Sequence, residues 1–241
     1  MDAVRLAREA FFAARDLVLP PHCAGCGAGI DGGWWCDPCR RLLQPIRPPR
    51  CEACSQPFSG AITGPFVCPN CHGRAFHFET AVAAFSSRGS LRELIHLLKY
   101  AKARWASKPL AELASLALED PRLQPAPEVL VPVPLHPLRQ RERGFNQSEL
   151  IARELSRLSG IPVSLPLVRI RATQTQTHFD RNQRMRNLRG AFALGQNASV
   201  SGLSILLVDD VLTTGSTLDE CARVLLAAGS GRVRALTVGR G

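Results

Sequence analysis

The chain has 241 residues, of which 45% are apolar and 21% charged, so it is long enough and ordinary enough in composition to fold as a globular protein with a substantial core. No apolar run approaches the ~20 residues that cross a bilayer and no secretory signal opens the chain, so we expect a cytoplasmic protein without a transmembrane segment, with peripheral attachment to the inner face of the membrane left open. The formal net charge of +10 favours anionic ligands but does not distinguish a small phosphate ester from a nucleic acid.

Residues 1–20 are predicted to form an amphipathic helix. Apolar residues recur every three or four positions between Asp2 and Leu19, and Pro20 and Pro21 end the pattern. Packing of this apolar stripe against the chain's own core is the favoured interpretation. Binding to a membrane surface or to a partner is the alternative.

Residues 21–76 hold eight of the nine cysteines in four C-x-x-C pairs. In a reducing compartment this spacing indicates metal binding, because two thiolates separated by two residues can reach one zinc ion from a tight turn. We predict two structural zinc sites in a double zinc-ribbon module, with each half of the segment holding one ion. Interleaved pairing, in which alternate pairs share an ion, stays open. The predicted ligands are Cys23, Cys26, Cys36, Cys39, Cys51, Cys54, Cys68 and Cys71.

The zinc sites also change the charge of the folded protein. Eight thiolates and two zinc ions lower the formal +10 to about +6. The protein therefore remains basic after the metal is counted.

Residues 77–241 are predicted to form a second, α/β domain. A strand over Ala81–Phe85 is followed by a helix that ends in a basic run beginning at Lys99. The further expected elements are a helix over Pro109–Glu119, a strand over Val129–Val133, a helix over Gln147–Leu158, a strand over Val163–Ile170, a return to the sheet at Phe192 and a last strand over Arg232–Val238.

Two arginine-rich segments interrupt this domain. A basic loop over His136–Asn146 carries three arginines at alternate positions, which suits a pyrophosphate, although a solvated basic turn would look similar. The segment Arg171–Gly190 is long, polar and non-periodic, which is typical of a functional loop. A nucleic-acid surface is the competing interpretation there, although only His178 and Phe179 offer rings for base stacking.

The most informative stretch is Ser204–Gly229. An apolar run typical of a buried parallel strand ends at Asp209 and Asp210, where a ligand crevice is expected. Small and hydroxyl-bearing residues follow, and a helix is predicted over Leu218–Ala228. Backbone N–H groups in such a loop, with a helix N-terminus behind them, form a nest of the size of a phosphate. The loop residues are Thr213, Thr214, Gly215, Ser216 and Thr217.

This stretch resembles the signature with which type I phosphoribosyltransferases bind phosphoribosyl pyrophosphate (PRPP). Together with LLKYAKAR, VPVPLHPLRQRERGFNQSELIA, RATQTQTHFDRNQRMRNLRGAF and the cysteine pairs, it makes nearly the whole chain similar to the ComF family of phosphoribosyltransferase-like proteins. The resemblance implies an α/β fold with a Rossmann-like parallel sheet behind the zinc-ribbon module.

The resemblance also implies roles for individual residues. Asp209 and Asp210 would hold the ribose hydroxyls with Mg²⁺, and Thr213–Thr217 the 5-phosphate. Lys99, Arg139, Arg141 and Arg143 would contact the pyrophosphate. Gln176, Arg184 and Asn187 would belong to a mobile loop that closes over PRPP.

Three functions are compatible with these motifs. The first, which the resemblance implies, is a PRPP-binding protein that handles single-stranded DNA with DNA-uptake proteins during natural transformation, with or without phosphoribosyl (glycosyl) transfer. The second is a salvage or biosynthetic phosphoribosyltransferase, and the third is a zinc-ribbon interaction protein that senses PRPP. No residue stands out as a general base, so the catalytic residues are unassigned, and the sequence names neither the acceptor nor the oligomeric state.

Overall fold

The computed structural model describes residues 21–60, 62, 64–172 and 188–241. The predicted N-terminal helix and the loop residues Gln176, Arg184 and Asn187 lie outside the described residues.

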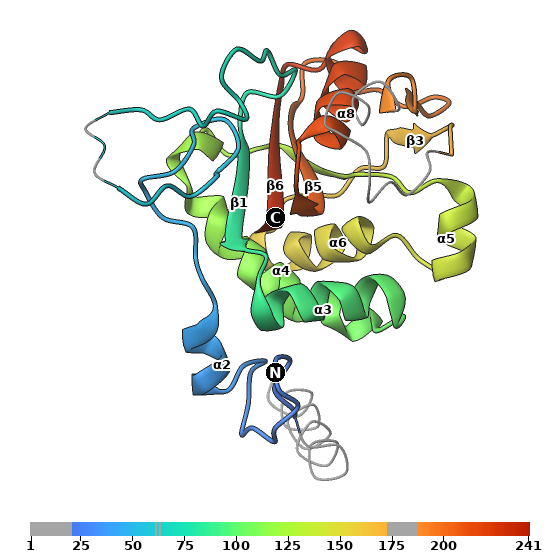
Figure 1. Cartoon of the computed structure of the whole chain (residues 1–241). Coiled ribbons are helices and arrows are strands. Elements are labelled where there is room, and N and C mark those ends of the chain that lie inside the picture. The colour runs from blue at the N-terminus through green and yellow to red at the C-terminus, as the bar shows by residue number, and fades with distance from the viewer. Residues whose placement is uncertain (1–20, 61, 63, 173–187) are drawn as a thin grey trace, which may run out of the picture.

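A parallel sheet forms the centre of the fold. Its strands lie in the order β1-β6-β5-β2, and every neighbouring pair is parallel (Figure 1). The apolar run at the start of β5 is fully buried, as expected of a strand that is covered on both faces. The α/β prediction is therefore confirmed. The strands are β1 (Ala81–Ser86), β2 (Val129–Pro132), β5 (Ser204–Leu212) and β6 (Arg232–Arg240).

Helices cover both faces of this sheet. Because successive side chains of a strand point to opposite faces, Leu206 and Val208 pack with α3, α4 and α6, while Ile205 and Leu207 pack with α8 (Figure 1). The helices on the first face are α3 (Gly89–Tyr100), α4 (Ser107–Ser115) and α6 (Gln147–Ser159), and α8 spans Ser216–Ala227. Short 3-10 turns lie at Arg104–Ala106, Leu116–Glu119 and Pro121–Leu123.

The predicted basic loop is wrong, because residues Pro137–Arg143 form a helix, α5. The His136 side chain accepts a hydrogen bond from the Leu138 N–H at its start, where Pro137 occupies the first turn. Gly144 ends the helix with a positive φ of 84°. Pro137 and Gly144 are ordinary signals for the start and the end of a helix. The many charged residues between them made the segment resemble a loop.

Two predicted strands also differ from the structure. β5 does not end at Asp209 but stays paired with β6 as far as Leu212. The strand expected over Val163–Ile170 shrinks to β3 (Leu167–Arg169), which pairs antiparallel with β4 (Phe192–Leu194) in a separate two-stranded sheet. Val163 instead forms an isolated parallel bridge with Leu130 of β2, and Pro166, which offers no N–H to a ladder, separates this bridge from β3.

The two ribbons pack on opposite sides of the core. Cys23, Trp35 and Cys39 of the first ribbon, which includes helix α2 (Asp37–Leu42), join the apolar cluster of α3 and α4. The four cysteines of the second ribbon join the cluster beneath α8. The Ile46 N–H between the ribbons donates to the Ala84 carbonyl of β1 at 2.9 Å. The boundary at residue 76 stays a prediction, and both ribbons share cores with the α/β domain.

Candidate functional site

The loop between β5 and α8 presents backbone N–H groups and hydroxyls at one end of a helix. Gly215 occupies the N-cap position with a φ of 78°, and no side chain caps the helix. Helix α8 begins at Ser216, two residues before the predicted start, so Ser216 and Thr217 lie in its first turn. The Thr214 and Ser216 hydroxyls are 3.0 Å apart. An uncapped helix N-terminus with hydroxyls beside it is a site for a phosphate.

Two carboxylates stand just before this loop and are held by another helix. The Ser148 hydroxyl at the start of α6 donates to Asp209 Oδ1 at 2.7 Å, and the Asp210 N–H donates to the same oxygen at 2.9 Å. The Asp210 side chain is buried and forms an ion pair with Lys99 from the last turn of α3. Gln147 Nε2 lies 3.5 Å from Asp210 Oδ1. Neither Ser148 nor Gln147 was predicted from the sequence.

The electrostatics of this pair favour a further cation. Burial, and next the Asp210 charge, raise the pKa of Asp209 to about 7, against the Ser148 hydrogen bond that lowers it. Burial lowers the pKa of Lys99, but the Asp210 carboxylate outweighs it and the net shift is upward. Two carboxylates that share one lysine fit a Mg²⁺-bound diol, because oxygen is the ligand that Mg²⁺ prefers.

Replacing Lys99 is expected to destabilise the ligand-free protein. Lys99→Met leaves Asp210 buried without its cation, which costs about 3 kcal/mol for a partly solvated pair of this kind. Lys99→Met combined with Asp210→Asn should recover most of that loss, because the uncompensated charge is gone. Urea unfolding of the four proteins followed by circular dichroism measures both effects. Strictly additive losses would contradict the pairing.

The helical form of residues 137–143 separates the three predicted pyrophosphate arginines. Arg139 and Arg143 lie one turn apart and line a cavity of about 180 Å³ together with Lys99 and Lys102. Burial lowers the pKa of Arg143, whose guanidinium also hydrogen-bonds Gln147. Arg141 is exposed and does not line this cavity. The structure therefore brings Lys99, Arg139 and Arg143 together beside Asp210 and leaves Arg141 apart.

A segment that follows the second ribbon, Arg74–Phe78, lies against the phosphate loop, and we call it the strap. Arg74 Nη1 donates to the Thr214 carbonyl at 3.2 Å, and its guanidinium lies 4.3 Å from the centre of the Phe76 ring. The positive φ of Gly215 favours glycine at that position, and a Cβ there would be in ordinary van der Waals contact with the rings, 3.4 Å from Phe76 and 3.5 Å from Phe78. The His77 N–H donates to Asp219 Oδ1 at 2.6 Å.

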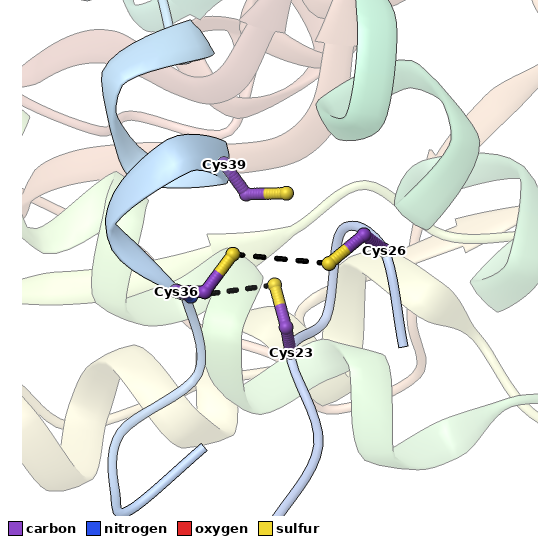
Figure 2. Close-up of side chains that lie close together, drawn as sticks. All are labelled: Cys23, Cys26, Cys36 and Cys39. Carbon is purple, nitrogen blue, oxygen red and sulfur yellow. Dashed lines mark hydrogen bonds between the residues drawn. The ribbon is translucent and has the colours of Figure 1, made fainter. Parts of the chain in front are cut away.

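The eight predicted zinc ligands form two separate clusters. In each, the four sulfur atoms lie within 4.8 Å of one another. Figure 2 shows the first cluster, in which the pair from one turn faces the pair that flanks the start of α2. Pairing is sequential, with Cys23, Cys26, Cys36 and Cys39 in one cluster and Cys51, Cys54, Cys68 and Cys71 in the other, so the interleaved alternative is excluded.

The chemistry of these donors fits zinc. Thiols this close resist ionising together, and burial followed by the neighbouring sulfurs raises the pKa of Cys39 to about 12. A divalent cation among them reverses that cost, and four thiolates complete the tetrahedral set of a structural site.

The clusters differ in their surroundings. All four cysteines of the second cluster are buried, whereas Cys26 is exposed and Cys36 half-buried in the first. Arg240 Nη2 at the end of β6 lies 3.9 Å from Cys54 Sγ, and Arg122 Nη1 donates to the Cys51 carbonyl at 3.1 Å. The second cluster is thus tied to the sheet by side chains of the α/β domain.

Fold and site together define a zinc-ribbon protein with a phosphoribosyltransferase domain. A double zinc ribbon family model matches residues 14–72, and a phosphoribosyl transferase domain model matches residues 142–240. The chain is 34% identical over 227 residues to the DNA utilization protein YhgH of Salmonella typhi, covering 90% of this chain and 96% of that protein. It is 32% identical over 213 residues to Competence protein F of Haemophilus influenzae, covering 86% and 90%.

The chain therefore belongs to the ComF family of competence and DNA utilization proteins. Among solved structures, the glutamine PRPP amidotransferase of B. subtilis aligns with 54% of this chain and 26% of its own at 18% identity and a TM-score of 0.37, too weak a match to support any statement on function. Within the described part of the chain, no helix is long and apolar enough to span a membrane.

Proposed function

We propose that this protein binds PRPP with Mg²⁺ where β5 meets α8, and that it serves the handling of single-stranded DNA in the cytoplasm. The observation that carries the first part is the pair Asp209 and Asp210, fixed by Ser148 and Lys99, directly before an uncapped helix N-terminus rich in hydroxyls. The carboxylate pair suits a ribose diol, and the helix N-terminus that follows it suits the 5-phosphate.

Each part of PRPP has a counterpart among the residues. Asp209 and Asp210 orient the ribose, and the loop Thr213–Thr217 binds the 5-phosphate through N–H groups and hydroxyls. Lys99, Arg139 and Arg143 stabilise the negative charge of the pyrophosphate as it leaves, and bound Mg²⁺ supplies further neutralisation of that charge. In this proposal Gln176, Arg184 and Asn187 belong to the segment that excludes water. This assigns the protein to the glycosyltransferases that use PRPP.

The proposed DNA role is supported by two observations. Relatives that match most of the chain are called DNA utilization and competence proteins. Lys102 and Arg139 line the cavity beside Lys99, next to the PRPP site, and such residues neutralise a phosphate backbone. Single-stranded DNA and DNA-uptake proteins are the partners that follow, and membrane attachment would be peripheral.

Calorimetry on the zinc-loaded full chain tests the proposal. PRPP is titrated with and without Mg²⁺ in buffer free of phosphate and sulfate, beside ribose 5-phosphate and pyrophosphate as half-ligands. We expect PRPP with Mg²⁺ to bind at least tenfold more tightly than either half. A fluorescent thymidine oligonucleotide, titrated with and without PRPP, tests the DNA role. Equal affinity for PRPP and pyrophosphate would reject the ribose site, and no oligonucleotide binding at low salt would reject the DNA role.

The strap gives a second test of the same site. Arg74→Ala removes a charge-assisted hydrogen bond to the Thr214 carbonyl and should weaken PRPP binding roughly tenfold, the equivalent of about 1.4 kcal/mol. Arg41→Ala, an exposed arginine on α2, is the matched control and should bind as the wild type does. Calorimetry measures the dissociation constant of PRPP for each variant. Equal affinities for the two variants would show that the strap does not position the loop.

A further inference from the structure

An exposed tyrosine stands at the rim of the cavity that holds the basic residues of the proposed PRPP site. Tyr100 is the last residue of α3, and it lines this cavity together with Lys99, Lys102 and Arg139. In Figure 1 the end of α3 faces the short helix α5, which supplies Arg139. Tyr100 is 68% exposed, so it takes little part in the core. A flat, largely apolar ring in this position is free to stack on a ligand.

Two neighbours fix the orientation of the tyrosine ring. The His96 ring, one turn earlier on α3, meets it at a centroid distance of 5.4 Å and an angle of 68° between the ring planes. The Arg143 guanidinium carbon lies 5.8 Å from the centre of the Tyr100 ring. A side chain held in this way loses little conformational freedom when a ligand stacks on it, which favours binding.

The cavity beside the ring has an excess of positive charge. Four basic side chains line it, against one carboxylate, that of Glu142. Within the described part of the chain, only Lys99 among the four forms an ion pair, with Asp210. Like charges around one cavity repel each other, and an anion between them relieves that repulsion. The four are Lys99, Lys102, Arg139 and Arg143.

The size of the cavity restricts what it can hold. Its volume of about 180 Å³ is below the range of about 300–1,000 Å³ in which proteins enclose whole small molecules. Phosphate groups are small enough to enter and carry the charge that the lining calls for. The rest of a larger ligand stays outside, where Tyr100 lies.

A phosphate among basic side chains with a flat ring beside it is the arrangement with which proteins hold single-stranded nucleic acid. The bases of a single strand are free to stack on aromatic side chains while basic residues follow the backbone. We infer that single-stranded DNA binds here with one base on Tyr100 and the adjoining phosphate between Lys102 and Arg139, so that DNA and PRPP exclude each other. The inference rests on the proposed function, in which the same cavity takes the pyrophosphate of PRPP.

Exclusion follows from the shared cavity. The pyrophosphate of PRPP and a phosphate of the strand both use Arg139 as a counter-ion, and two anions in so small a space repel each other. By linkage, the factor by which PRPP weakens DNA binding equals the factor by which DNA weakens PRPP binding. Pyrophosphate alone should compete as PRPP does, whereas ribose 5-phosphate leaves the cavity empty and should not compete.

Competition by these half-ligands tests the inference. A fluorescent single-stranded thymidine oligonucleotide is titrated with the zinc-loaded full chain and followed by anisotropy, at constant ionic strength and with Mg²⁺ throughout. PRPP or pyrophosphate, present at about ten times its own dissociation constant, should raise the apparent dissociation constant of the oligonucleotide about tenfold. Ribose 5-phosphate should leave it within about twofold. A duplex of the same length, whose bases are stacked on one another, should bind at least about tenfold more weakly than the single strand.

Matched variants separate stacking from charge. Tyr100→Ala should weaken oligonucleotide binding roughly tenfold, and Tyr100→Phe, which keeps the ring, should bind as the wild type does. Both should bind PRPP within about threefold of the wild type, because the ring is no part of the proposed PRPP site. Arg139→Ala should weaken both ligands and reduce the slope of log K against log salt by about 0.7, the value of one phosphate contact on a single strand. Arg141→Ala, an exposed arginine on the same helix that does not line the cavity, should leave both affinities and the slope nearly unchanged.

The outcomes separate this inference from the proposed function, because calorimetry measures PRPP binding independently. Oligonucleotide binding that persists at saturating PRPP would overturn the shared cavity while leaving both ligands of the proposed function in place. A Tyr100→Ala protein that binds the strand as the wild type does, or an Arg141→Ala protein as weak as Arg139→Ala, would overturn it as well, since binding would then depend on net charge alone. Failure of both PRPP and pyrophosphate to bind would reject the PRPP site, and the exclusion with it.

Discussion

Replacing both Asp209 and Asp210 by asparagine is expected to weaken PRPP binding by at least about 100-fold, because two charge-assisted interactions with the ribose and its Mg²⁺ are worth about 3 kcal/mol or more together. Asparagine keeps the size of each side chain and can still accept the Ser148 hydrogen bond at position 209, whereas Asp210→Asn also breaks the ion pair with Lys99. Calorimetric titration of PRPP with Mg²⁺ measures the loss directly.

Stability provides the control for this experiment. The folded pKa of Asp209, about 7, lies above the value of about 4 for an unfolded aspartate, so ionising Asp209 costs the folded state free energy. The neutral form of Asp209 therefore contributes fully to the free energy of unfolding below pH 4, and this contribution is lost as the pH rises through 7. Asp209→Asn should therefore be as stable as the wild type at pH 4 and more stable at pH 8.

The double variant discriminates between a binding site and a structural pair of acids. Weak PRPP binding by a double variant that is still folded at the temperature of the titration, as its unfolding midpoint shows, assigns the loss to lost contacts with the ligand. Unchanged PRPP affinity in the double variant would mean that the two acids serve only the fold, and the proposed site would have to be abandoned.

The parts of this site that could be predicted from the sequence are those whose residues are neighbours along the chain. The acids, the phosphate loop and the first turn of α8 follow one another along the chain, and each C-x-x-C pair spans four residues, so local spacing was enough to assign them. The class of fold followed from the same logic, because an unbroken apolar run such as Ile205–Val208 is typical of a buried parallel strand.

The parts of the site that the sequence did not predict are contacts between segments that lie far apart in the chain. Ser148 lies 61 residues before Asp209, and Arg74 lies 140 residues before Thr214. No local pattern predicts which side chains meet across such separations, because the folded sheet brings them to one edge. The short helix α5 is a different case: Pro137 and Gly144 were visible as its start and end, but its charges were interpreted as a loop.

The second ribbon is expected to be the more important of the two for both folding and PRPP binding. Cys51→Ser should lose the second zinc ion and either unfold the protein or lower its unfolding temperature by more than about 10 °C, since structural zinc supplies much of the folding free energy of such modules. Cys26→Ser should lose the first ion with a smaller fall. Native mass spectrometry counts the metal, and calorimetry measures unfolding and PRPP affinity.

The two ribbons are expected to differ in importance because their zinc clusters contact different parts of the protein. Cys51 is buried in the core beneath α8. Its cluster is connected to the phosphate loop by the strap at Thr214, and to Leu212, the residue before that loop, by Arg240. Cys26 is exposed, and its cluster packs on the opposite side of the sheet. If Cys51→Ser stays folded at low temperature, it should bind PRPP at least tenfold more weakly, whereas Cys26→Ser should bind within about threefold of the wild type. The reverse order would show that the first ribbon, despite its exposure, is the one that supports the site.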